Sequence, residues 1–330
     1  MSNPPAQPAD NPTASRPVAA RPPVETSLAS TIAVLVVPSR SPLALVPLWA
    51  VLCGACMAYA RGTQAPHSPQ VLLALVLAVA IVGVLWSTWR ALLVDVDWAA
   101  RFRRHPLPAP RLLSGLPYTT PWSPLGRLVT RAGQLRRWSQ DVPLEIGAAR
   151  YTLLVLPALI LVLSALAGWP LLLLSLAALS LSLLERRAAQ AGQAHAALRA
   201  GMQVGLGWLA GHVTLAPLTW TAVTLACCYA IAYQGALGLA ARADTHTRRA
   251  LPWLYGGQVA AIGLLALLDR PLTAAFAAFL LAPQWLLLVA LGRMRAQDGA
   301  RAQDSAHARY LQRALPFYLL ATLAAAWAPG

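Results

Sequence analysis

The sequence predicts an all-α, polytopic membrane protein with nine transmembrane helices and a cytosolic amino terminus. Three observations lead to this fold class. The chain is 58% hydrophobic and only 11% charged, whereas about 25% of the residues in a soluble domain are charged. Its apolar residues gather in runs of helical length, and its basic residues are dense on alternate sides of these runs. A single soluble core cannot hold this many apolar residues with so few charges.

Nine apolar runs have the length that a membrane-spanning helix requires. A hydrocarbon layer ~30 Å thick is crossed by about 20 helical residues, or a few less at the short end of the range. Some runs are separated only by tight turns that contain proline, such as Gly168–Pro170 and Asp269–Pro271. Proline ends a helix because it removes a hydrogen-bond donor and fixes φ. The predicted spans are 42–60, 70–93, 151–167, 171–184, 201–217, 219–240, 251–268, 272–292 and 314–329.

The distribution of the basic residues predicts the orientation of these spans. All 26 basic residues are arginine, and the formal net charge is +15. With a cytosolic amino terminus, the inner segments hold 24 of the 26 arginines, which leaves only Arg61 and Arg270 outside. Positive charge resists translocation, so the arginine-rich segments are expected to face the cytosol. Because the charge is spread along a membrane face, the sequence gives no support for a nucleic-acid partner.

The chain divides into a tail and a membrane domain. Residues 1–29 hold seven prolines and are typical of a disordered cytosolic tail. Residues 30–330 form the membrane domain, with a long basic cytosolic loop at 94–150. In that loop Ser123 and Pro124 predict a helix start, and helical spacing of the apolar residues predicts an interfacial amphipathic helix. This helix is either an anchor for anionic lipid, which we favour, or a lid over a cytosolic-side cavity.

Two carboxylates at the inner end of the second span precede a basic, proline-rich segment. They are Asp95 and Asp97, and Arg103 and Arg104 follow them. Carboxylates bind Mg²⁺ and arginines clamp phosphate oxygens, so the combination suits a diphosphate. The alternative is a set of ordinary ion pairs at a solvated helix end, which the spacing alone favours.

A related group of charges follows the sixth span. Asp244 is followed closely by Arg248 and Arg249. One aspartate among several arginines is a poor metal site and a better anion site. The two groups of charges converge only if spans two and six are neighbours in the bundle.

Polar and small residues within the spans have structural interpretations. Glu185, at the end of the fourth span, is expected to pair with Arg199 or another interfacial arginine. The fifth span contains small residues at four-residue spacing, which permit close helix packing. These residues are Gly201, Gly205, Gly207 and Gly211.

The topology and the local sequence resemble the UbiA superfamily of intramembrane prenyltransferases. Its members have nine helices, a cytosolic amino terminus and active-site motifs after helices two and six. The first motif, Asp-rich and followed by Arg-Pro-Leu/Ile-Pro, is similar to Asp97 and His105–Pro108. The second motif, Asp-rich and followed by Thr-Leu-Pro and a later glycine, is similar to Asp244, Ala250–Pro252 and Gly256.

The resemblance covers about residues 40–329 and implies transfer of a prenyl group from an isoprenoid diphosphate to an acceptor. It implies a Mg²⁺ cofactor held by Asp95, Asp97 and Asp244, with Asp97 and Asp244 as the catalytic residues. The arginines that it implies for the diphosphate are Arg103, Arg104, Arg248 and Arg249. Membrane lipids are the further expected partners, and the expected location is the bacterial cytoplasmic (inner) membrane.

The acidic motifs are shorter than those of the family. With Asp97 in the last acidic position of the first motif, the two earlier positions fall on Leu93 and Trp89, and Ala243 occupies one acidic position of the second motif. The alternative function is therefore a non-catalytic membrane subunit or a lipid-binding scaffold with the same helical shape. A transporter ranks last, because few charged residues lie at the predicted midplane.

Overall fold

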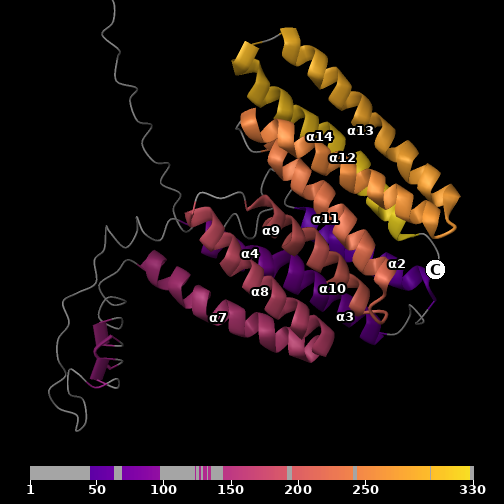
Figure 1. Ribbon diagram of the computed structural model, residues 1–330. Coiled ribbons are helices and arrows are strands. Elements are labelled where there is room, and N and C mark those ends of the chain that lie inside the picture. Colours follow the sequence, from indigo (N-terminus) through magenta and orange to yellow (C-terminus); the bar gives the residue numbers. More distant parts are fainter. Residues whose placement is uncertain are drawn as a thin grey trace, which may run out of the picture.

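The protein folds as a bundle of helices (Figure 1). The computed structural model describes residues 45–62, 69–96, 123, 126–127, 129–131, 133–134, 144–191, 195–240, 244–297 and 299–327. Every regular element in these ranges is a helix, and none of them contains a strand. The predicted tail at 1–29 and most of the 94–150 loop lie outside the described residues. Within that loop the Gly126 N–H donates to Ser123 Oγ at 2.9 Å, so Ser123 caps a helix start as predicted.

Each of the nine predicted spans falls on a helical segment in the described part of the chain. The second and fifth segments contain π-helical stretches, which the sequence did not predict. In chain order the elements are α2 (Val46–Ala60), α3 (Pro69–Val79), η2 (Ala80–Trp86), α4 (Ser87–Arg90), η3 (Ala91–Asp95), α7 (Leu144–Ala167), α8 (Trp169–Gln190), α9 (Ala196–Ala200), η4 (Gly201–Leu206), α10 (Gly207–Val213), α11 (Trp220–Ala240), α12 (Asp244–Leu267), α13 (Pro271–Gln297) and α14 (Gly299–Ala326).

Successive segments run in opposite directions, so their ends gather at two ends of the bundle (Figure 1). We call one of them the turn end; it holds residues 61–62, 168, 214–219 and 268–270. Gly168, with a φ of 134°, makes the sharp reversal between α7 and α8, a conformation that glycine adopts at little cost. The opposite end, the arginine end, holds the helix ends at Asp95, Gln190, Ala240 and Gln297. It is the end that the arginine distribution predicts to be cytosolic.

The segment at 293–313, which lies between the predicted spans 272–292 and 314–329 and would therefore be a loop, is mostly helical. α13 continues to Gln297, and α14 begins at Gly299 rather than near residue 314. The arginines in this segment exclude it from the bilayer, but alanine, arginine and glutamine are good helix formers. Charge therefore marked the end of the apolar run and not the end of the helix.

The helices are apolar on their outer surfaces as well as inside. Within the described part of the chain, five helices are long and apolar enough to cross a membrane, among them Val71–Asp95 and Trp220–Leu239, and Val46–Ala60 and Thr152–Ala167 are shorter apolar helices. Large apolar side chains such as Leu272 lie exposed on the bundle surface. Exposed apolar surface of this extent is covered by lipid rather than water. The helices thus indicate an integral membrane protein, while the count of nine spans and their orientation stay predictions.

The close packing of α2 against α10 depends on two glycines. A Cβ atom on Gly54 would overlap the Trp208 carbonyl, and one on Gly211 would overlap the Val51 carbonyl. The predicted role of the small residues in the fifth span is confirmed at Gly211. Gly201, in contrast, faces open space, because nothing lies within 4 Å of the position of its Cβ.

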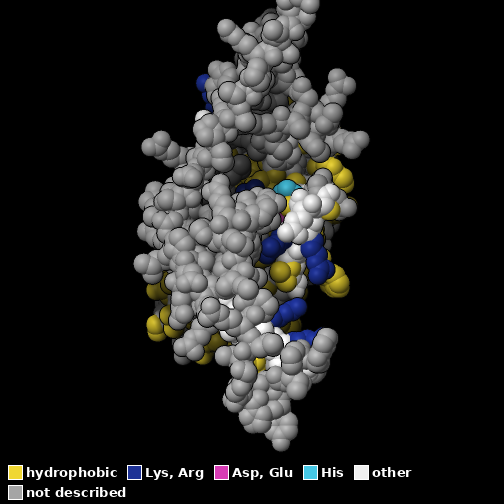
Figure 2. Space-filling model, turned by 90° about the vertical axis from the view of Figure 1, so that its left-hand side faces the viewer, with side chains coloured by type: hydrophobic (Ala, Val, Ile, Leu, Met, Phe, Trp, Pro, Cys, Tyr) yellow, Lys and Arg dark blue, Asp and Glu magenta, His cyan; other side chains and the backbone are white. Residues whose placement is uncertain are grey.

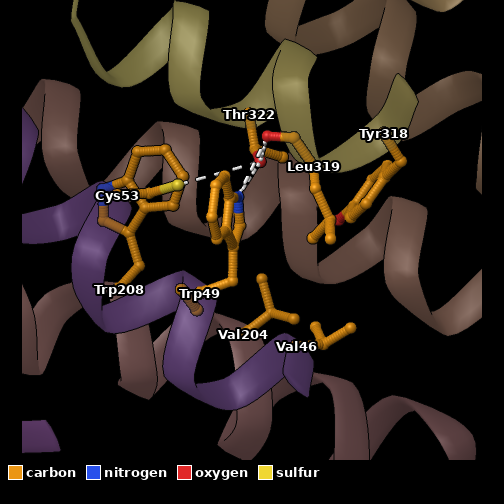
Figure 3. Close-up of a pocket in the computed structure, with 9 residues that line it drawn as sticks. Val46, Trp49, Cys53, Val204, Trp208, Tyr318, Leu319 and Thr322 are labelled. Carbon is orange, nitrogen blue, oxygen red and sulfur yellow. Dashed lines mark hydrogen bonds between the residues drawn. The ribbon is translucent and has the colours of Figure 1, made fainter. Parts of the chain in front are cut away.

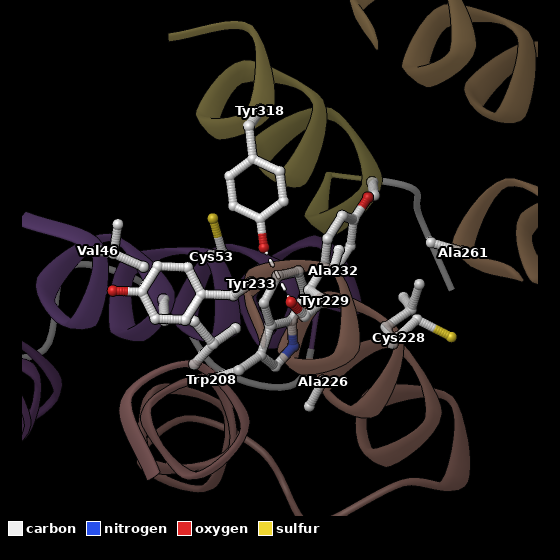
Figure 4. Close-up of a cluster of buried hydrophobic side chains, with 14 of the residues drawn as sticks. Val46, Cys53, Trp208, Ala226, Cys228, Tyr229, Ala232, Tyr233, Ala261 and Tyr318 are labelled. Carbon is white, nitrogen blue, oxygen red and sulfur yellow. Dashed lines mark hydrogen bonds between the residues drawn. The ribbon is translucent and has the colours of Figure 1, made fainter. Parts of the chain in front are cut away.

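Aromatic side chains fill the centre of the bundle between α2, α10, α11 and α14 (Figure 4). Trp208 stacks on Tyr229 with ring centroids 5.5 Å apart, and the Tyr318 hydroxyl donates to the Tyr229 carbonyl at 2.9 Å. Trp49 Nε1 donates to the Leu319 carbonyl at 2.9 Å (Figure 3). The void beside these rings measures about 10 Å³, which is room for a single water molecule. This part of the interior is therefore a packed core.

Candidate functional site

A buried arginine joins the second and fourth helical segments at the arginine end. Arg90 in α4 is 4% exposed, and Glu185 in α8 is 1% exposed. Arg90 Nη2 donates to Glu185 Oε1 at 2.7 Å, and Arg90 Nε lies 3.1 and 3.0 Å from the two carboxylate oxygens. A two-pronged contact of this kind is the strongest form of Arg–carboxylate pairing. The expected partner of Glu185 was an interfacial arginine, and it is Arg90 rather than Arg199.

The same guanidinium also holds Asp95. Arg90 Nη1 lies 3.2 Å from Asp95 Oδ2, and Arg90 Nη2 lies 3.4 Å from Asp95 Oδ1. The Asp95 side chain is 58% exposed, so its carboxylate is also open to a ligand. Arg90 thus orients an accessible acid by means of a buried cation, and Glu185 balances the charge of that cation.

A π-helical segment brings Arg90 and Asp95 onto the same face. Asp95 is the fifth residue after Arg90, and η3 (Ala91–Asp95) is π-helical. A π-helix pairs residue i with residue i+5, whereas an α-helix places side chains three or four residues apart on one face. Stretches of π-helix are frequent at functional sites. The local backbone therefore creates a contact that α-helical spacing does not predict.

A second set of polar side chains links the fifth and sixth segments at the same end. Arg199 Nε donates to Gln203 Oε1 at 3.2 Å, and the Tyr233 hydroxyl donates to the same oxygen at 3.2 Å. Gln203 lies in η4, and Tyr233 in α11 is fully buried. Arg199 and Gln203 lie on α9 and η4, and both elements pack against α8, the helix that carries Glu185. The two hydrogen-bonded sets therefore lie on neighbouring helices at one end of the bundle, and together we call them the polar cluster: Arg90, Asp95, Glu185, Arg199, Gln203 and Tyr233.

The polar cluster offers both an acid and a cation to a ligand. Asp95 is exposed, and Arg199 is partly exposed at the start of the fifth segment. Figure 2 looks onto this end of the bundle and shows arginine side chains and a histidine side chain on its surface. A carboxylate that can bind a cation, beside arginines whose N–H groups donate to phosphate oxygens, suits a negatively charged substrate with a metal ion.

The structure tests few of the residues that the sequence singled out. Asp95 is described and is paired with Arg90. Asp244, Arg248 and Arg249 lie in the first turns of α12, but their side chains are outside the described set. Asp97, Arg103 and Arg104 are outside the described residues altogether. Whether the acids after spans two and six converge therefore stays a prediction.

No three His, Cys, Asp or Glu side chains of the described ranges are grouped so that they could hold a metal ion. Of the three predicted Mg²⁺ ligands only Asp95 has a described side chain, and its exposed carboxylate is compatible with that role. The predicted Mg²⁺ site also needs Asp97 and Asp244, whose side chains are outside the described set, so the site stays a prediction.

Sequence reasoning did not assign Arg90, Gln203 or Tyr233 to a site. A usable signal was present, because an arginine or glutamine inside an apolar helix is costly unless it is paired. Their partners were not visible, since Arg90 and Glu185 are separated by 95 positions in the chain.

The fold and the polar cluster define an all-α integral membrane protein with a charged site at one end. Part of the chain is similar to the bacteriochlorophyll synthase 34 kDa chain of Chloroflexus aurantiacus (strain ATCC 29366 / DSM 635 / J-10-fl), with 35% identity over 126 residues. The similarity covers 32% of this chain and 41% of that protein, so the chain spans about two fifths of the relative's length. No family model matches the chain, and no solved structure matches it.

Proposed function

We propose that the chain is a UbiA-like membrane prenyltransferase, which transfers a prenyl group from an isoprenoid diphosphate to an acceptor with Mg²⁺. The observation that carries this proposal is the similarity over 126 residues to a bacteriochlorophyll synthase chain, a prenyltransferase of that superfamily. The apolar helical bundle supports it, because the substrate of such an enzyme has a long hydrocarbon part. The charged groups at one end of the bundle support it as well, because the other part of the substrate is a diphosphate.

In this proposal Asp95, Asp97 and Asp244 hold Mg²⁺, and Asp97 and Asp244 are the catalytic residues. When bound, the ion neutralises the charge that develops on the leaving diphosphate. The arginines of the two loops bind the diphosphate oxygens: Arg103, Arg104, Arg248 and Arg249.

The described residues have a supporting role at this site. Arg90 fixes the Asp95 carboxylate, and Glu185 neutralises Arg90, so the buried cation does not compete with Mg²⁺ for the diphosphate. Arg199 adds a partly exposed positive charge, which Gln203 orients. Charges that are fixed before the substrate binds stabilise a developing charge more effectively than mobile ones.

A specific observation favours the alternative of a non-catalytic subunit or lipid-binding scaffold. Trp89 and Leu93 stand where the family carries acids, and their side chains are buried in the apolar core at 8% and 4% exposure. In addition, Asp95 already has a cationic partner in Arg90. A site with fewer acids than the family uses would bind lipid without performing the transfer.

The test is a prenyl-transfer assay on membranes from cells that express the full chain. Membranes are incubated with Mg²⁺ and labelled prenyl diphosphates of several lengths, and the lipids are extracted and separated. The proposal expects a labelled lipid that disappears in Asp97→Asn and in Asp244→Asn. Arg270→Gln, at the turn end, is the matched control and keeps the activity.

Two results would contradict the proposal. One is a labelled product that forms equally in the wild type and in both aspartate variants. The other is a folded wild-type protein that binds labelled prenyl diphosphate but yields no labelled lipid with any acceptor fraction, which would instead favour the scaffold.

A further inference from the structure

At the turn end, Arg61 is held by hydroxyl groups rather than by an acid. Its Nη1 donates to Thr219 Oγ1 and its Nη2 donates to Thr221 Oγ1. These two hydroxyls are 3.2 Å apart. Arg61 is only partly buried. Its Nε is buried and has no hydrogen-bond partner, and Nη1 and Nη2 each carry a second N–H besides the one donated to a threonine. None of the ion pairs found among the described residues involves Arg61.

The surroundings of Arg61 are electropositive for a second reason. Thr219 is the residue before α11, and its Oγ1 accepts the Ala222 N–H at 3.4 Å. The first turn of a helix presents backbone N–H groups and the positive end of the helix dipole. A guanidinium beside that turn has no compensating negative charge in the described part of the chain. Burial lowers the pKa of Arg61, which is the expected effect when a cation loses water without gaining a carboxylate.

Exposed tryptophans place this end of the bundle at the level of lipid headgroups. Trp169 begins α8, Trp220 begins α11, and Trp327 follows α14, and they are 72%, 86% and 57% exposed. All three lie at the turn end. Tryptophan is enriched where the bilayer meets water, because its ring is apolar and its N–H is polar. At this depth the abundant anion is the phosphate of a phospholipid.

An apolar groove lies beside the same loop. It has a volume of about 580 Å³ and is lined by Trp169, Pro170 and Leu173 of α8 and by residues 213–218. Leu218, which lines it, is the residue before Thr219. Grooves of several hundred Å³ lined by apolar side chains are typical of ligand sites. Hydrocarbon is the occupant that suits such a groove beside a membrane, because apolar side chains are covered more favourably by an acyl chain than by water.

We propose that the turn end binds one phospholipid, with its phosphate on Arg61, Thr219 and Thr221 and an acyl chain in the groove beside Leu218. The combination of a cation, a pair of hydroxyls that together keep one O–H free for a ligand, and an adjoining apolar groove matches the two chemically different parts of such a lipid. The site lies at the opposite end of the bundle from the polar cluster, so it is independent of the proposed transferase activity.

The test compares lipids and variants on the delipidated full-length protein in mild detergent. Thermal unfolding is measured with phosphatidylglycerol, with diacylglycerol of the same chains and with inorganic phosphate, and bound lipids are counted by native mass spectrometry. We expect phosphatidylglycerol to raise the unfolding temperature of the wild type. In Arg61→Gln, about ten times more phosphatidylglycerol should be needed for the same rise in unfolding temperature. Native mass spectrometry should find one bound lipid fewer on this variant than on the wild type. Arg270→Gln removes the other arginine predicted to lie outside and should behave as the wild type.

Each alternative result overturns a defined part of the proposal. Equal responses of Arg61→Gln and Arg270→Gln would remove Arg61 from lipid binding. Inorganic phosphate that acts as strongly as the lipid would mean a free-anion site without the groove, and diacylglycerol that acts as strongly would mean a groove without the phosphate contact. If Arg61→Gln does not fold, Leu218→Asp takes its place, because Leu218 is 55% exposed and lines the groove, and a carboxylate in the groove opposes binding of an acyl chain. An unchanged lipid response in Leu218→Asp would also overturn the proposal.

Discussion

Each end of the bundle holds an arginine in its structure, and the two are used in opposite ways. Arg90, at the arginine end, is 4% exposed and contacts the carboxylates of Glu185 and Asp95. Arg61, at the turn end, is partly exposed and contacts the hydroxyls of Thr219 and Thr221. When a cation is paired with carboxylates, its charge is compensated within the protein, and its role is to orient the carboxylates. A cation held by hydroxyls keeps its charge available to an external anion.

The first way to break this comparison is to ask whether the two ends face opposite sides of the membrane. Reporter fusions after Gly168 at the turn end and after Gly192, which follows α8 in the chain, should give opposite results: a given reporter should be fully active in one fusion and inactive in the other. The reason is that 24 of the 26 arginines lie in segments predicted to be inside. Enzymatic reporters that are active on only one side of the membrane measure this, and reporters active on the same side for both fusions would contradict the topology.

The largest expected difference in stability comes from removing the acid that balances Arg90. Glu185→Gln leaves a buried guanidinium with only the exposed Asp95, and breaking a buried pair in this way costs about 3–5 kcal/mol in the free energy of unfolding. Arg61→Gln at the turn end should cost at most about 1 kcal/mol in lipid-free detergent, since partly exposed contacts are weak. Denaturant titration of the two variants measures both values. Equal losses would show that the two arginines are not used differently.

Much of the fold was predictable, and the charged site was not. The length of the apolar runs and the proline turns located the helical segments of the described residues, because burial in lipid depends on local composition. The segment at 293–313 was misassigned as a loop, since its arginines disfavour the bilayer but not the helix. The pairing of Arg90 with Glu185 depends on how the second segment packs on α8, and the contact of Arg90 with Asp95 depends on a π-helical turn. Neither is encoded in the composition of one segment.

The fifth segment offers a comparison between the two ends within one helix. Gly211, toward the turn end, packs against α2, and Gly201, at the arginine end, faces open space. Gly211→Ala should destabilise the protein by about 1–3 kcal/mol, because a well-packed contact does not accept another carbon atom. Gly201→Ala should be neutral, or stabilising by up to about 1 kcal/mol, since alanine favours the helix. Thermal unfolding of the two variants decides this, and a loss in Gly201→Ala as large as in Gly211→Ala would contradict the packing.

The smallest expected effect tests whether one acceptor at the arginine end serves two hydrogen-bond donors. Gln203 Oε1 accepts from both Arg199 and Tyr233. Tyr233→Phe removes one donor and leaves the oxygen paired with Arg199, so it should cost only about 0.5–1 kcal/mol. Gln203→Leu removes the shared acceptor and leaves the buried Tyr233 hydroxyl without its partner, which costs more, about 1–3 kcal/mol. In the Tyr233→Phe background no hydroxyl is left unpaired, so the further cost of Gln203→Leu in thermal unfolding measures the Arg199 contact. If Gln203→Leu costs nothing more in that background, the Arg199 contact adds nothing, and Gln203 does not orient this partly exposed cation.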